Sequence, residues 1–323
     1  MKPSLPLMSL LLGCAHVAPA LAFDCAAARS PVEKAICANT PLLALDDQIN
    51  QAYGALRAAG DAGAKAALQG SQRAWLALRD ACANQDKVNA CLATRMNGRL
   101  NYLTGAPQAG PGAESRLVPL IRWRNGRGKS GQQIETFAFA GSATAGEKRF
   151  NELVRGYVDE LIADMSGEPD RETNIETTAA VTYASARLVS VHMDSYTMAE
   201  GAAHPNMSSR DVNVDLARGR ELGFADLFDG TAAHKVVSLC RAQVLQDKKE
   251  RGVDQPEAQE LSDFDAALDK SLRDLRTWSF TADHVSVTFD RYALGSYAEG
   301  GYGCDLPYAD LRPLAKPGAW VVE

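Results

Sequence analysis

The sequence is poor in the residues from which hydrolytic and metal centres are built. After the first 22 residues its histidines are His192, His204, His234 and His284. It contains no Gly-x-Ser-x-Gly and no His-Glu-x-x-His motif, which argues against a serine hydrolase and a zinc protease. It has no Cys-x-x-Cys pair, which argues against a structural zinc site. We therefore expect neither enzymatic activity nor a cofactor.

Long apolar runs are also missing from the chain after residue 22. No run there reaches the roughly 18 residues of a membrane span. Residues 1–22 have the pattern of a secretory signal: Lys2, an apolar run over 5–12, and the cleavage sequence Ala20-Leu21-Ala22. Leu-Leu-Gly before Cys14 also resembles a lipobox, the alternative to cleavage after Ala22. We expect a periplasmic or secreted protein that is anchored to a membrane only if Cys14 is lipidated.

Length and charge divide the chain into two parts. The 323 residues, 46% of them hydrophobic, are enough for two cores. A Gly/Pro-rich segment predicts a linker at 105–114, between a domain at 23–104 and another at 115–323. Residues 23–103 carry nine Lys/Arg against seven Asp/Glu, whereas residues 104–323 carry 24 against 33. Such an acidic second part favours basic partners over nucleic acid.

Removal of the signal would leave six cysteines, an even number that indicates disulfides in an exported protein. Four lie in the first part and two, Cys240 and Cys304, in the second, so we expect no disulfide between the parts. Sequence alone allows three pairings of the first four. Of these we favour Cys25 with Cys91 and Cys37 with Cys82.

The first part has helical spacing throughout. Ser30-Pro31-Val32-Glu33 has the form of a capping box, and Thr40-Pro41 opens a second helix that ends near Gly60. Two more helices are predicted around 68–82 and 92–103. This pattern predicts an all-α hairpin or bundle stapled by disulfides, with Trp75 in its core and Arg79 in an ion pair within the domain.

The second part mixes both periods and predicts an α+β domain with an antiparallel sheet. Strands are expected at 117–123, 134–139 and 285–289, and helices at 150–165, 236–244 and 258–275. Between them, Val189, Val191 and Met193 alternate with polar residues, and alternation resumes at 211–216. Two antiparallel strands joined by a polar, glycine-containing loop are therefore expected here.

Candidate binding residues lie on this loop and on a second glycine-rich segment. Glu200 and Glu299 are both flanked by glycine and suit charge-assisted contacts with a basic partner. Tyr196 and Tyr297 are candidates for buried contact area, and His204 lies in the loop itself. The alternative is a metal site formed by His204 with the sequence His192-Met193-Asp194. A structural histidine is the commoner case, so we expect no metal.

Two sets of residues resemble known families. Phe23-Asp24-Cys25, the run from Ser30 to Cys37, Gln72-Arg73-Ala74-Trp75, the run from Arg79 to Cys82, and Cys91 resemble the N-terminal domain of the lysozyme-inhibitor LprI family. Tyr196, the run from Glu200 to Pro205, Asn213-Val214-Asp215-Leu216, Asp226-Leu227-Phe228, the run from Tyr297 to Gly300, and Pro307-Tyr308 are similar to the exported domain of the anti-sigma factor RsiV and to accessory domains of peptidoglycan deacetylases. Where those relatives have Gly-Gly-Ala-His, this chain has Ala202 before Ala203-His204.

The resemblances imply one function that we expect and one alternative. In the first, an exported binding protein captures lysozyme or a related muramidase and occludes its active-site cleft. In the second, the chain is a non-catalytic module that binds peptidoglycan or assists a wall-modifying enzyme. The first predicts strong dependence on ionic strength, and the second predicts little.

Overall fold

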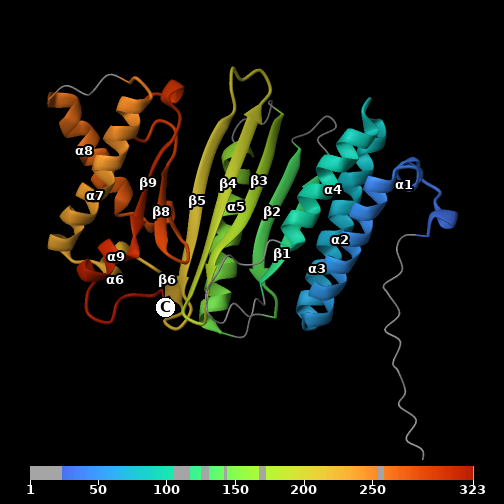
Figure 1. Cartoon of the computed structure of the whole chain (residues 1–323), viewed down its shortest axis with the longest axis horizontal. Helices are drawn as coiled ribbons and strands as arrows, with labels where there is room; N and C mark the ends of the chain where they lie inside the picture. Colours follow the sequence, from blue (N-terminus) through green and yellow to red (C-terminus); the bar gives the residue numbers. More distant parts are fainter. Residues whose placement is uncertain are drawn as a thin grey trace, which may run out of the picture.

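The computed structural model describes residues 24–104, 117–124, 131–141, 144–166, 172–253 and 258–322. It has a helical region, a six-stranded sheet, and a C-terminal lobe with a smaller sheet (Figure 1). The prediction of a disulfide-stapled helical region followed by an α+β region with an antiparallel sheet is confirmed. The expected signal segment, Cys14 and the expected linker lie outside the described residues.

The helical region consists of α1 (Pro31–Cys37), α2 (Thr40–Ala59), α3 (Ala62–Asp80) and α4 (Val88–Thr104). The capping box is confirmed: the Ser30 hydroxyl accepts from the Glu33 amide at 3.1 Å, and the Glu33 carboxylate accepts from the Ser30 amide at 2.8 Å. Trp75 is 2% exposed, as predicted. Arg79 pairs within the region with Asp80 at 2.8 Å and lies 3.8 Å from Asp46.

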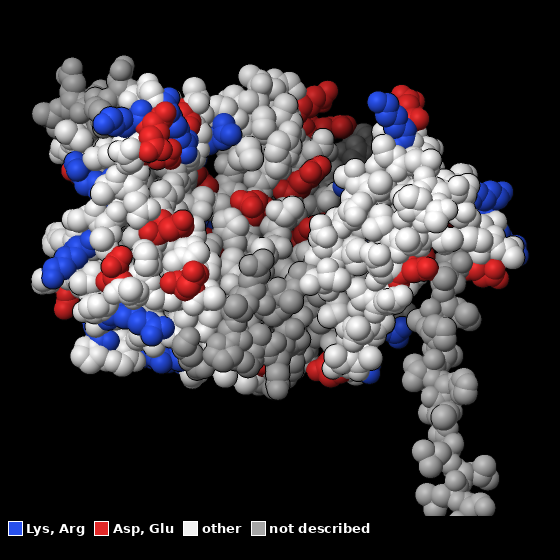
Figure 2. All heavy atoms as spheres, in the orientation of Figure 1, with Lys and Arg blue, Asp and Glu red and all other residues white. Residues whose placement is uncertain are grey.

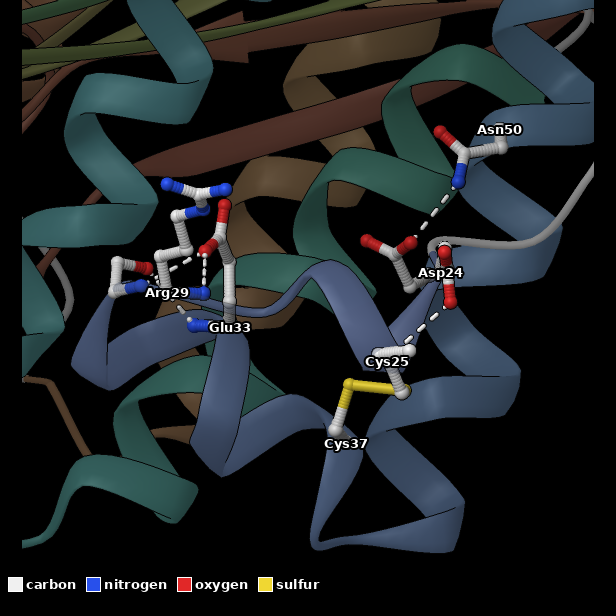
Figure 3. Close-up of a disulfide and its surroundings, with 9 residues drawn as sticks. Asp24, Cys25, Arg29, Glu33, Cys37 and Asn50 are labelled. Atoms are coloured by element: carbon white, nitrogen blue, oxygen red, sulfur yellow. Dashed lines mark hydrogen bonds between the residues drawn. A yellow bond between two sulfur atoms is a disulfide. The ribbon is translucent and has the colours of Figure 1, made fainter.

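The disulfides of the helical region differ from the favoured pairing, which is wrong. Cys25 pairs with Cys37 and Cys82 pairs with Cys91, at sequence separations of 12 and 9. The chain before α1 turns back, so that Cys25 meets the last residue of that short helix (Figure 3). Each bridge therefore closes a local loop. The predicted pair of Cys240 with Cys304 is confirmed, and it joins two distant elements of the C-terminal lobe.

The large sheet has the strand order β1-β2-β3-β4-β5-β6. Its strands are β1 (Leu117–Arg124), β2 (Gln132–Phe139), β3 (Thr173–Ala184), β4 (Leu188–Ala199), β5 (Asn206–Asp215) and β6 (Arg220–Glu221). All neighbours are antiparallel except β2 and β3, which are parallel and connected through α5 (Ala145–Ser166). Strand β3 was not predicted. Strand β5 begins earlier than expected, which shortens the β4–β5 loop to residues 200–205.

Helix α5 covers one face of this sheet (Figure 1). Val189, Val191 and Met193 lie in one hydrophobic cluster with side chains of α5, as their alternation predicts. In the β4–β5 loop Gly201 has a φ of 76°, whereas Ala202 has no positive φ. Ala202 therefore adds no backbone strain at the position where the sequence pattern noted above has a glycine.

The helical region covers the β1 edge of the sheet. On α3, the Ser71 hydroxyl accepts from the Ile121 amide at 3.0 Å and donates to the Pro119 carbonyl at 3.3 Å. On α4, the Tyr102 hydroxyl donates to the carbonyls of Leu120 and Thr136. The Ser71 bonds satisfy groups of β1 that an exposed edge strand would leave open to another chain. One hydrophobic cluster includes residues of both regions.

The C-terminal lobe covers part of the sheet face opposite α5. It contains α6 (Phe224–Leu227), α7 (Gly230–Glu250), α8 (Ala258–Leu272), β7 (Trp278–Phe280), β8 (His284–Phe289), β9 (Tyr302–Pro307) and α9 (Tyr308–Leu311). The Asn213 amide donates to the carbonyls of Leu275 and Trp278 at 2.7 and 2.8 Å. The Phe280 amide donates to the Ser190 hydroxyl at 3.1 Å. Polar residues of β4 and β5 are thus buried beneath the lobe.

Candidate binding surface on the large sheet

Beyond the lobe, the face of the large sheet opposite α5 is open to solvent. A row of cross-strand neighbours runs over it, from Gln133 on β2 through Glu176 on β3 and Tyr196 on β4 to Met207 on β5. Tyr196 and Met207 are 37% and 45% exposed, unusually high for large apolar side chains. Exposed Asp194 lies two residues before Tyr196 on the same strand. We call these five residues the open face.

The open face is acidic. Figure 2 shows acidic side chains gathered over the middle of the molecule, where Figure 1 places the large sheet. Glu176 and Asp194 belong to the face, and Asp290 borders it by accepting from the amide and hydroxyl of Ser209 at 2.9 and 2.8 Å. On the opposite border, Arg95 of α4 donates to Gln133 at 2.6 Å. Both the helical region and the C-terminal lobe therefore adjoin the open face.

Glu135 lies two residues after Gln133 on β2, near Arg95 and Arg99 of α4. Burial raises the pKa of its carboxyl to about 7, although Arg99 and Arg95 favour the charged form, and Glu176 adds repulsion. Its charge therefore changes near neutral pH. Glu135 was not identified from the sequence, because nothing in the local pattern indicates that α4 covers this strand.

An aromatic cluster stands beside the open face, formed by His204, Tyr292 and Tyr297. The rings of His204 and Tyr297 stack with centroids 4.0 Å apart, and Tyr292 lies 5.6 Å from Tyr297. The Tyr297 hydroxyl donates to the Pro205 carbonyl at 3.2 Å, which ties the two loops together. The structure thus brings together two of the predicted candidates, His204 and Tyr297.

Tyr292 was not identified from the sequence. It is 64% exposed, and it has a φ of 70°, the one positive φ of a non-glycine residue in the described part of the chain. A bulky residue in this conformation is strained by roughly 1–3 kcal/mol. Strained residues concentrate at functional sites, so Tyr292 joins the candidates. No periodicity signal marks it, since it lies in a turn.

The two candidate glutamates have different environments. Glu200 is exposed at the start of the β4–β5 loop. Glu299 instead accepts from Lys248 at 2.7 Å, from the Tyr302 hydroxyl at 2.6 Å and from the Ser296 amide at 2.7 Å. Burial alone would raise its pKa, but these donors outweigh it and lower the pKa to about 2. The Glu299 carboxylate holds its own loop in place, whereas Glu200 faces solvent.

The two histidines considered for a metal site have separate partners. His192 lies with Nδ1 3.1 Å from Asp211 and Nε2 3.2 Å from Asp194. Burial lowers its pKa, but the two carboxylates outweigh this and raise the pKa to about 10, so the ring is a cation. His204 stacks on Tyr297 instead. Within the described ranges, no group of three His, Cys, Asp or Glu side chains is placed to hold a metal ion.

Ser279 completes a polar cluster at the border between the lobe and the open face. Its hydroxyl donates to the buried Asp211 at 2.5 Å. Because the proton goes to the carboxylate, and His192 Nε2 faces Asp194, this Ser-His-Asp group lacks the arrangement that activates a serine nucleophile. Its role is to join β4, β5 and β7.

Comparison with solved structures found two distant likenesses. A crystal structure of a DUF3298 family protein from Pseudomonas aeruginosa is 17% identical, with a TM-score of 0.43, over 64% of this chain and 97% of its own. Another, from Bacteroides fragilis, is 15% identical, with a TM-score of 0.40, over 62% and 93%. These likenesses are too distant to carry an argument, and they do not confirm the resemblance to RsiV. No curated protein matches the chain.

Two further findings concern the cellular setting. The described residues form three disulfides, as in proteins of oxidising compartments. In the part of the chain that the structure describes, no helix has the length and apolar character to cross a membrane.

The family comparison concerns the helical region. Residues 25–103 match the model of the lysozyme-inhibitor LprI family.

Proposed function

We propose that this protein captures a lysozyme or a related muramidase and blocks its active-site cleft. The observation that carries the proposal is the match of residues 25–103 to a lysozyme-inhibitor family. That region is held against the sheet by Ser71 and Tyr102, so it and the open face belong to one body. Inhibition by occlusion needs no catalytic group on the inhibitor.

The open face supplies the electrostatic part of the proposed interaction. Glu176 presents negative charge beside exposed Tyr196, and Asp194 adds a carboxylate whose charge the His192 cation partly offsets. An acidic surface raises the association rate of a cationic partner, and its effect falls as salt screens it. Because strands of a packed sheet carry these side chains, little ordering is needed when a partner binds.

Aromatic side chains supply the contact area. Tyr196 and Met207 are neighbours across β4 and β5, and Tyr292 protrudes from the aromatic cluster. Tyrosines near the centre of an interface commonly provide much of its binding energy. We propose that Tyr196, Glu200, His204, Tyr292 and Tyr297 contact the partner, and that Glu299 keeps the Tyr297 loop in its conformation.

The test is the lysis of bacterial cell walls by a chicken-type lysozyme with and without the mature full-length chain. Inhibition at a near-equimolar ratio is expected, together with co-elution that weakens when ionic strength rises from about 0.05 to about 0.3 M. Glu152→Ala, on the exposed surface of α5, is the matched control and should inhibit like the native chain. If lysis proceeds at the uninhibited rate and no complex elutes at low salt, this proposal is wrong.

A non-catalytic peptidoglycan-binding module is the second candidate. It is favoured by the exposure of Tyr196 and Tyr292, because tyrosine rings offer flat apolar surface with a polar end. Retention on insoluble peptidoglycan that persists at high salt, without inhibition of lysozyme, would support it. Loss of retention at high salt would count against it.

A further inference from the structure

A second concave site lies away from the open face, where the helical region meets the large sheet. It is a cleft of about 380 Å³ enclosed by α3, β1, β2 and α5. This volume falls in the range of small-molecule sites. The opening exists because α3 presents only the small side chains of Ala67 and Ser71 to this space. The Ser71 hydroxyl is already engaged by the backbone of β1.

The walls of the cleft are apolar. Ile121 and Ile134 line it from β1 and β2, and Val154 and Val158 line it from α5. All four belong to the hydrophobic cluster shared by the helical region and the sheet. Asn151, which also lines the cleft, uses its amide for two 2.8 Å bonds with the backbone of Phe139. The interior therefore suits an aliphatic chain.

The mouth of the cleft is charged. Arg122 of β1 and Arg155 of α5 both line it and are exposed, as is Asp159. Neither guanidinium group has a hydrogen bond or ion pair with any other residue that the structure describes. Two guanidinium groups and one carboxylate give a net charge of one positive unit. Guanidinium binds carboxylates in a planar, bidentate manner. A ligand with one negative charge would neutralise the net charge at the mouth.

We propose that this cleft binds a fatty carboxylate, with the aliphatic chain between α3 and α5 and the carboxylate at Arg122 and Arg155. The apolar walls take the methylene groups of the chain out of water, which favours binding. The two arginines select an anionic head over a neutral or cationic one. The site is independent of the lysozyme proposal.

The experiment is isothermal titration calorimetry of the mature full-length protein with dodecanoate, below the concentration at which dodecanoate forms micelles. One molecule should bind per chain. Arg122→Ala and Arg155→Ala should each weaken binding at least fivefold, because each removes one half of the carboxylate clamp. Both residues are exposed, so neither change is expected to prevent folding. Dodecyltrimethylammonium, with the same chain and a cationic head, should not bind.

A second variant tests the apolar part of the cleft. Ala67→Leu places a larger side chain into the cleft from α3, where leucine is well tolerated in a helix. It should weaken binding at least tenfold while the melting temperature stays near that of the native chain. Lys148→Ala, about two turns before Arg155 on α5 and outside the cleft, is the charge-matched control and should bind dodecanoate normally.

Three results would overturn the proposal: no heat of binding with dodecanoate, equal binding of dodecyltrimethylammonium, or affinities of the arginine and Ala67 variants equal to that of the native chain. The last would indicate adsorption elsewhere on the surface. Inhibition of lysozyme by the same variants should not change. That measurement separates a failure of this site from a failure of the proposed function.

Discussion

Two ends of one sheet face have similar sequence patterns and different environments. At one end, Ser190 and Asn213 lie under the C-terminal lobe, and both are fully or almost fully buried. At the other end, Glu176 and Tyr196 on the same sheet face are exposed. Alternation of polar and apolar residues marks which face is opposite α5, but it does not show which polar residues another part of the chain will cover.

The covered end uses its polar side chains for structure. The amide nitrogen of Asn213 bonds two carbonyls of the lobe, and Ser190 accepts an amide proton from β7. A β-bulge between Val181 and Tyr183 places Tyr183 in the hydrophobic cluster of the lobe, whereas Val181 packs on the α5 side. Among the residues that the structure describes, the open end has no such cover, and Glu176, Tyr196 and Met207 remain exposed to a partner.

The largest expected effect is the loss of stability when the covered end is changed. Asn213→Ala leaves the buried carbonyls of Leu275 and Trp278 without this donor, so we expect the free energy of unfolding to fall by about 3 kcal/mol. Chemical denaturation followed by circular dichroism measures it. Thr178→Ala on the exposed part of β3 is the control and should change stability by less than about 0.5 kcal/mol. Similar losses in both variants would contradict the distinction between the two ends.

The next effect is on binding at the open end. Tyr196→Ala should weaken the affinity for lysozyme by at least about tenfold, equivalent to about 1.4 kcal/mol, because a central aromatic contact is lost. Its stability should stay close to that of the native chain, since Tyr196 is exposed. Surface plasmon resonance with immobilised lysozyme gives the affinity. An unchanged affinity would remove Tyr196 from the interface.

A smaller effect is expected from a single charge. Glu176→Gln should slow the association with lysozyme by about two- to threefold at low salt and leave dissociation nearly unchanged, because exposed charges act mainly through steering. Stopped-flow measurements at two ionic strengths test this. The difference between the variant and the native chain should disappear at high salt, and a difference that persists there would indicate a direct contact instead.

Sequence reasoning predicted the helical region better than the site. The capping box at Ser30, the helix starting at Thr40 and the buried Trp75 are local or periodic features, so sequence spacing was enough to identify them. The pairing of Cys25 was missed because it depends on how the chain turns before α1. In the candidate site, His204 and Tyr297 were predicted as separate candidates, and the contact between their rings was not predicted. The positions of Tyr292 and Glu135 depend on contacts between distant segments, which periodicity does not encode.

The smallest predicted effect is the pH dependence that Glu135 gives to the border of the open face. Its pKa of about 7 in the folded protein lies above the ordinary 4.5, so the folded state holds this proton more tightly than the unfolded chain does. The resulting stability is fully present below pH 4.5 and is lost as the pH rises toward 7. Ionisation of Glu135 in the folded protein around pH 7 adds negative charge beside Glu176, so the affinity for a cationic lysozyme should rise by about twofold between pH 6 and 8. Glu135→Gln should lose both slopes while the native chain keeps them. Because stability and affinity change in opposite directions, a general change in folding cannot imitate the result, and equal pH profiles for the variant and the native chain would show that Glu135 does not titrate in this range.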